Sequence, residues 1–148
     1  MVVLVGVGVT LCTLVVQGVA SALGVEAVGA LVARRMVGAR LWRNGLATLM
    51  LALILWVGHL MQMAVWAVIF VAAGEFREFA VAFYHSAVNY TTLGYGDVIM
   101  SPRWRLLGPQ EAASGTLAFG WSIAVIVTVV VRLTRHRHRA AVKPPAGS

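Results

Sequence analysis

The sequence predicts an all-α membrane protein with three transmembrane helices and one shorter re-entrant helix. Composition is the first reason, because 60% of the 148 residues are hydrophobic and only 11% are charged, which is unlike a soluble domain of this size. The second is a set of three apolar stretches, each near or above the ~20 residues that a spanning helix needs. A fourth apolar stretch, of about three turns, is too short to cross the bilayer and has to return to the side it entered from.

The amino-terminal part is predicted to contain a transmembrane helix over residues 1–24 and a cytoplasmic interfacial helix over residues 25–45. The first is rich in glycine and valine and carries Gln17, which favours close packing against another helix. It lacks a basic start, so we expect an anchor rather than a cleaved signal peptide. Cys12 is the only cysteine and is expected to be a packing residue.

Arginines in the second segment raise the alternative of a voltage sensor, because Arg34, Arg40 and Arg43 keep a three-residue register. However, that register is interrupted by Val37, and one helix precedes the arginines where a sensor needs a bundle to move through. We therefore favour the simpler interpretation, which is a set of basic residues at the cytoplasmic interface.

The second and third spans are predicted at residues 46–73 and 108–133, with the short helix at residues 79–91 between them. Glu111, in the first turn of the third span, complements the positive end of that helix's dipole. A basic tail follows at residues 134–148 and is too short and polar to fold by itself.

Basic residues set the predicted orientation of the spans. Nine of the twelve lie in two segments that the positive-inside rule places in the cytoplasm: Arg34, Arg35, Arg40, Arg43, Arg132, Arg135, Arg137, Arg139 and Lys143. The amino terminus and residues 75–111 are then outside, and the carboxyl terminus is cytoplasmic. The net charge of +7 is polarised across the membrane, so no nucleic-acid partner is expected. The expected location is a cell membrane, crossed several times, and the compact chain suggests a prokaryote.

Between the short helix and the third span, residues 91–97 have the sequence Thr-Thr-Leu-Gly-Tyr-Gly-Asp. Directing successive carbonyl oxygens toward one axis requires a backbone that alternates between right- and left-handed conformations, and glycine reaches positive φ at little cost. Gly94 and Gly96 supply that freedom, and the Thr92 hydroxyl adds an oxygen ligand at the inner end. Such irregular backbone is tolerated at membrane depth only where it lines a polar path.

This run, in this order of helices, resembles the signature of the potassium channel family, in its two-transmembrane, single-pore-loop bacterial form with an extra N-terminal span. The resemblance implies a pore domain over residues 46–133, with an outer helix at 46–73, a pore helix at 79–91, a selectivity filter at 92–96 and an inner helix at 108–133. It also implies a homotetramer with three identical subunits as partners, because one chain carries one filter, and passive, potassium-selective conduction.

The same resemblance assigns the ion-binding residues. Potassium ions are expected to bind at Thr92, Leu93, Gly94 and Tyr95, with Gly96 completing the filter. No cofactor other than these ions is expected.

Residues around the filter are expected to support it. Thr91 and Asp97 flank it, and Val88 occupies a position where some bacterial members of the family carry a glutamate that pairs with the acid after the filter. Asp97 lacks that partner here, so Tyr84 and His85 on the neighbouring turn are the candidates to hold it.

Four residues within the spans have two interpretations each. Gly115 and Gly120 lie where the family's inner helix has its hinge glycine, and the alternative for either is close packing against a bulky neighbour. His59 and Gln62 lie one turn apart on one face of the second span. A metal or proton site is one possibility for this pair, and we favour a hydrogen-bonded helix interface.

The tail alternates arginine and histidine over Arg135, His136, Arg137 and His138. Such a cluster binds anionic lipid head groups, and its histidines titrate near neutral pH, so it is a candidate pH and lipid sensor. The plainer alternative is a topology signal, which the arginines alone satisfy.

Three other functions compete with the potassium channel. A non-selective cation channel has the same parts with a filter that flexes, and a non-conducting accessory or scaffold subunit has the same fold. An intramembrane enzyme is the weakest alternative, since neither a catalytic pair nor a metal cluster is evident in the sequence.

Overall fold

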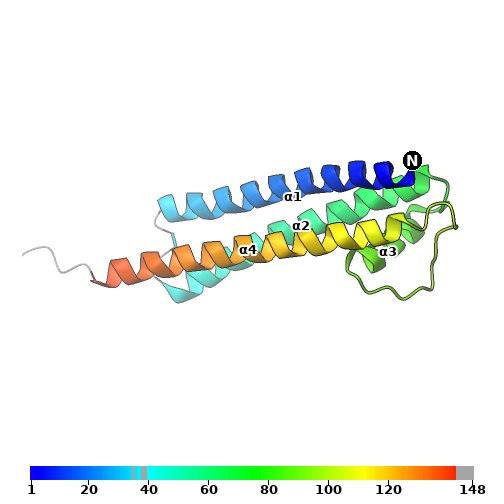
Figure 1. The fold of residues 1–148 in the computed structure, drawn as a ribbon. Coiled ribbons are helices and arrows are strands. Elements are labelled where there is room, and N and C mark those ends of the chain that lie inside the picture. The colour runs from blue at the N-terminus through cyan, green and yellow to red at the C-terminus, as the bar shows by residue number, and fades with distance from the viewer. Residues whose placement is uncertain (35, 38–39, 143–148) are drawn as a thin grey trace, which may run out of the picture.

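The computed structural model describes residues 1–34, 36–37 and 40–142, with side chains as far as Arg135 (Figure 1). Four helices follow one another along the chain: α1 (Val2–Ala33), α2 (Leu41–Ala72), α3 (Phe79–Tyr90) and α4 (Leu107–Val142). No strand occurs in these described ranges. The predicted all-α class is confirmed.

Three of the helices are long and apolar enough to cross a membrane. They are α1, α2 and residues Leu107–Arg135 of α4. At 1.5 Å per residue, the 32-residue helices α1 and α2 are about 48 Å long, more than the ~30 Å of a hydrocarbon core. By contrast, α3 has 12 residues, or about 18 Å, and cannot cross. The chain is therefore a membrane protein, as its composition predicted.

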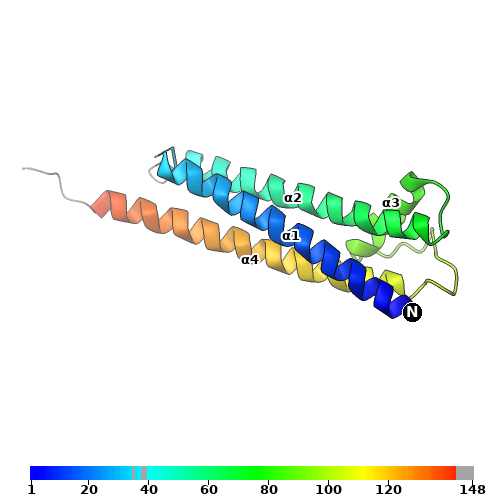
Figure 2. The same ribbon diagram turned by 90° about the horizontal axis from the view of Figure 1, so that it is seen from above.

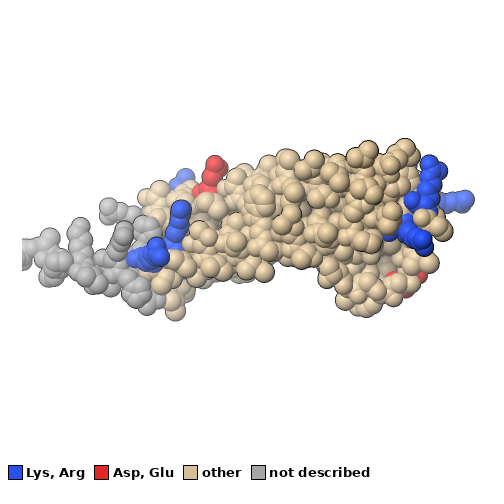
Figure 3. All heavy atoms as spheres, in the orientation of Figure 1, with Lys and Arg blue, Asp and Glu red and all other residues tan. Residues whose placement is uncertain are grey.

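The three long helices lie side by side, and α3 lies at one end of the bundle (Figures 1 and 2). α1 packs against α2 and α4, while α3 packs against α2 and α4. Within the part of the chain described, α1 and α3 do not approach each other directly. The N-terminus and α3 share one end, and the α1–α2 turn lies at the other with the end of α4. On the face seen in Figure 3, charged side chains lie near these two ends.

Buried apolar side chains form two clusters, one toward each end of the bundle. The α3-end cluster consists of Val9, Met63, Trp66, Ala67, Phe70, Ala82, Tyr90, Leu107 and Ala118. The turn-end cluster consists of Val28, Ala47, Leu51, Leu55, Val129 and Leu133. Because lipid tails are as apolar as these side chains, close packing between helices, rather than expulsion from water, is what stabilises both clusters.

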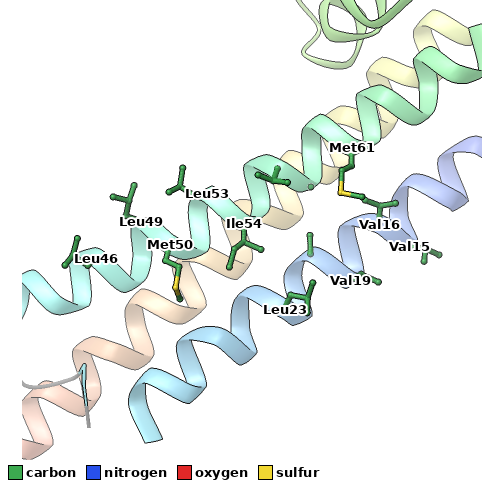
Figure 4. Close-up of a pocket in the computed structure, with 13 residues that line it drawn as sticks. Val15, Val16, Val19, Leu23, Leu46, Leu49, Met50, Leu53, Ile54 and Met61 are labelled. Carbon is green, nitrogen blue, oxygen red and sulfur yellow. The ribbon is translucent and has the colours of Figure 1, made fainter. Parts of the chain in front are cut away.

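A groove between α1 and α2 is open on one side (Figure 4). The residues that line it are all apolar: Val15, Val16, Val19, Ala20, Leu23, Leu46, Leu49, Met50, Leu53, Ile54, Val57, Gly58 and Met61. Such a surface suits lipid tails and provides no oxygen ligand from a side chain, so an ion path does not run between these two helices.

The structure differs from the prediction for residues 25–45, which do not form a separate interfacial helix. Residues 25–33 continue α1, because Val28 extends the buried face that runs from Gly6 to Gly24. Residues 41–45 already belong to α2. Arg34 follows the last residue of α1, Arg40 precedes α2, and Arg43 lies in the first turn of α2. The tail also differs, since α4 continues to Val142.

The two candidate hinge glycines of α4 have different surroundings. A Cβ atom at Gly115 would overlap the backbone carbonyl oxygen of Tyr90, whereas a Cβ atom at Gly120 would have nothing within 4 Å. Gly115 therefore allows α4 to approach the end of α3 closely, which is the packing alternative. The hinge role remains a prediction for Gly120.

We expect Gly115→Ala to lower the free energy of unfolding by about 1–3 kcal/mol, because the added methyl group meets rigid backbone at Tyr90. Gly120→Ala is the matched control, since its methyl group enters open space. Thermal or denaturant unfolding of the protein in detergent measures both. Equal stability of the two variants would contradict the close contact between α4 and α3.

Candidate functional site

The predicted filter, residues 92–96, follows the end of α3 directly, and its first amides fold back onto that helix. The backbone N–H of Thr92 donates to the carbonyl oxygen of Asn89 at 2.8 Å. The N–H groups of Leu93 and Gly94 both donate to the carbonyl oxygen of Val88, at 2.9 and 3.2 Å. The last carbonyls of a helix have no partner within the helix, so these bonds satisfy the end of α3 and position the filter on it.

Positive φ angles recur at every second residue of the filter. They are 62° at Thr92, 62° at Gly94 and 73° at Gly96. The sequence predicted this conformation for the two glycines but gave no signal for Thr92, whose branched side chain disfavours it. A non-glycine residue held there costs on the order of 1–3 kcal/mol and persists only where surrounding contacts determine it.

The carbonyl oxygens of residues 92–96 accept no hydrogen bond from any other described residue. The segment is also exposed, and 66% of Tyr95 and 54% of Leu93 are accessible. Unpaired backbone carbonyls are costly in a membrane unless another ligand occupies them. These carbonyl oxygens are therefore available to a ligand.

Two successive side chains of α3 hold the residues that follow the filter. The Tyr84 hydroxyl donates to Asp97 Oδ2 at 2.7 Å, and this bond lowers the pKa of Asp97 below its usual value. His85 Nδ1 donates to the carbonyl oxygen of Val98 at 2.8 Å, while its Nε2 accepts from Asn89 at 2.8 Å. Burial lowers the pKa of His85, in keeping with this neutral tautomer. Of the two candidates, Tyr84 is the residue that holds Asp97.

The loop after the filter has a second attachment, to the turn between α2 and α3. Both oxygens of the Glu75 carboxylate accept bonds from Ser101, one from its backbone N–H at 2.6 Å and one from its hydroxyl at 2.7 Å. The sequence placed residues 75–111 outside but did not indicate this bond. The loop is thus held both by α3 and by the turn that precedes α3.

Glu111 lies near the start of α4 and is fully buried. Its Oε1 is 2.5 Å from the hydroxyl oxygen of Ser86, which is also 2.9 Å from the carbonyl oxygen of Met63. The sequence predicted that Glu111 complements the dipole of the third span. The structure adds that its side chain links the first turns of α4 to the middle of α3.

Five buried polar side chains meet where the four helices come together, and we call them the polar ring: Gln17, His59, Gln62, Tyr90 and Ser122. Five hydrogen bonds of 2.9–3.0 Å connect them in a closed circuit. The favoured prediction of a hydrogen-bonded interface for His59 and Gln62 agrees with this arrangement. The sequence also predicted close helix packing at Gln17, whereas Tyr90 and Ser122 were missed, although a polar residue such as Ser122 in the middle of an apolar span is itself a signal.

Of the predicted sensor residues in the tail, Arg135 has a described side chain. Arg135 is exposed on the last turns of α4. His136, Arg137 and His138 have side chains outside the described residues, so the sensor stays a prediction. Over the described ranges, no group of three His, Cys, Asp or Glu side chains is placed to hold a metal ion.

Comparison with known proteins gives one match. Residues 47–132 match the family described as ion channel, and this range is more than half of the chain. It runs from the beginning of α2 to residue 132 in α4 and leaves α1 outside. No curated protein and no solved structure matches the chain.

We expect Tyr84→Phe to raise the pKa of Asp97 toward its usual value. The Tyr84 hydroxyl stabilises the carboxylate, so its contribution to holding the loop is present above the usual pKa of aspartate and is lost as pH falls through the lowered pKa. The carboxyl carbon signal of Asp97 in an NMR titration reports this change. Tyr95→Phe, which removes a hydroxyl that is not bonded to Asp97 in the described chain, is the control. Identical titration in wild type and Tyr84→Phe would contradict the assignment.

Proposed function

Since the chain belongs to the ion channel family that its residues 47–132 match, we propose that it is the subunit of a homotetrameric, potassium-selective channel. Residues 92–96 of four chains form the filter, and potassium ions pass in file down their gradient. The proposal assigns the ions to the carbonyl oxygens of Thr92, Leu93, Gly94 and Tyr95, with the Thr92 hydroxyl at the inner end.

The observation that carries the proposal is the backbone of the filter. Its first three amides bond to the end of α3, its positive φ angles recur at every second residue, and its carbonyls accept no hydrogen bond within the described chain. A cation entering a pore has to lose water, and a ring of carbonyls can replace that water. One chain supplies one strand of such a ring, and the exposure of the strand supports its completion by other copies.

The short helix α3 adds an electrostatic contribution to the proposed pore. Its carboxyl end, which has the partial negative charge of a helix terminus, lies directly before the filter at Tyr90. Four such ends around one axis favour a cation that has lost part of its water. At the other end of the filter, the Asp97 carboxylate is fixed by Tyr84 and adds a negative charge near the entrance.

Flux from liposomes that contain the purified protein tests the function. We expect potassium to pass and sodium to be largely excluded. Equal passage of both ions would favour the non-selective cation channel, and no flux of either from correctly assembled protein would favour the accessory subunit.

We expect Gly96→Ala to abolish potassium flux while the protein still reaches the membrane, because alanine disfavours the positive φ that the filter needs. Gly74→Ala is a matched control. Gly74 has a similar φ of 76° with open space around it, but it lies in the turn after α2 and outside residues 92–96. Both variants are assayed by the same liposome flux. Normal selective flux through Gly96→Ala would exclude this filter.

A further inference from the structure

The hydrogen bonds of the polar ring all run in the same direction around the circuit, from donor to acceptor. Gln17 Nε2 donates to Ser122 Oγ at 2.9 Å, and Gln62 Nε2 donates to Gln17 Oε1 at 2.9 Å. The Tyr90 hydroxyl donates to Gln62 Oε1 at 3.0 Å. These three bonds fix the donors and acceptors at the two remaining contacts of His59.

His59 completes the circuit in one tautomer. The Tyr90 hydroxyl has given its hydrogen to Gln62, so His59 Nδ1 has to donate to it across 3.0 Å. His59 Nε2 then accepts from Ser122 Oγ at 3.0 Å. Within the circuit, each of the five residues therefore donates one bond to the next and accepts one from the previous residue.

The ring lies in the middle of the bundle, and its five side chains are buried. Gln17, His59 and Ser122 lie near the middle of their spans, and the ring shares Tyr90 with the α3-end cluster. A polar group without a partner at that depth is costly, so the circuit favours one relative position of the four helices.

The ring is also the connection between α1 and α3. These helices do not approach each other directly within the described chain, but Gln17 reaches Tyr90 through Ser122 and His59 on one side and through Gln62 on the other. Tyr90 is the last residue of α3.

We propose that α1 is a working part of the conduction unit, in which Gln17 is a positioning residue that fixes Tyr90, and through it the start of the filter, by closing the polar ring. The inference rests on the proposed function for its effect on ions. It assigns a role to a helix that lies outside the family match at residues 47–132. The competing view is that α1 only anchors the chain in the membrane.

The test compares variants of the full-length chain in liposomes. Gln17→Leu keeps the volume of the side chain and removes both bonds of α1 to the ring. Ser122→Ala breaks the same ring from α4 by removing one oxygen. This second variant provides the test if Gln17→Leu does not assemble. Thr13→Val is the matched control, because Thr13 is equally buried on α1 and its hydroxyl bonds within its own helix, to the carbonyl oxygen of Thr10.

Two quantities are measured for each variant. One is the hydrogen exchange of the amides of Thr92, Leu93 and Gly94, which bond to the end of α3. The other is the ratio of potassium to sodium flux. Hydrogen bonds between membrane helices contribute about 0.6–1.7 kcal/mol. We therefore expect about threefold to twentyfold faster exchange and a lower flux ratio in Gln17→Leu and Ser122→Ala, with neither change in Thr13→Val.

Each outcome decides a separate point. Unchanged exchange in assembled Gln17→Leu and Ser122→Ala overturns the inference. Faster exchange with an unchanged flux ratio also overturns it, because the ring would then be structural support alone. If the wild type does not conduct, the proposed function fails, and the exchange of the filter amides still decides whether α1 positions this segment.

Discussion

A lipid bilayer offers no water to a polar group, so each polar group that this chain carries into the hydrocarbon has to be matched inside the protein or by a bound ligand. The end of α3 shows the consequence. The amides of Thr92, Leu93 and Gly94 are matched by the carbonyls of Val88 and Asn89. The carbonyls of the filter are then left without a donor in the described chain, and a cation with part of its water is a chemically suitable replacement.

The same constraint explains how an unfavourable backbone is kept in place. A positive φ at Thr92 costs on the order of 1–3 kcal/mol, which is comparable to one or two hydrogen bonds within a membrane. The contacts around it are more numerous than that. Three amide bonds hold the filter to α3, and Tyr84 and His85 hold the two residues that follow it. The conformation is therefore determined by α3 rather than by local preference.

The difference between local preference and tertiary contact also divides what the sequence predicted from what it did not. Long apolar runs predicted the spans, and the conformational freedom of glycine predicted the positive φ angles at Gly94 and Gly96. Thr92 was missed because nothing in a threonine favours that conformation. Residues 25–45 were assigned to an interfacial helix because arginines suggest an interface, but burial against α2 and α4 decides where α1 ends.

Contacts between helices that are distant in the sequence could not be predicted from each segment taken separately. Gln17 and Ser122 are 105 positions apart, and each looks like an isolated polar residue in an apolar run. In the folded chain, the polar ring connects both residues to Tyr90. The Tyr90 hydroxyl belongs to that ring, and its backbone carbonyl lies against Gly115. A movement of α4 or α1 therefore displaces Tyr90 or breaks a buried bond. Since the filter begins within two residues of Tyr90, a change in the packing of the spans also changes the geometry of the filter.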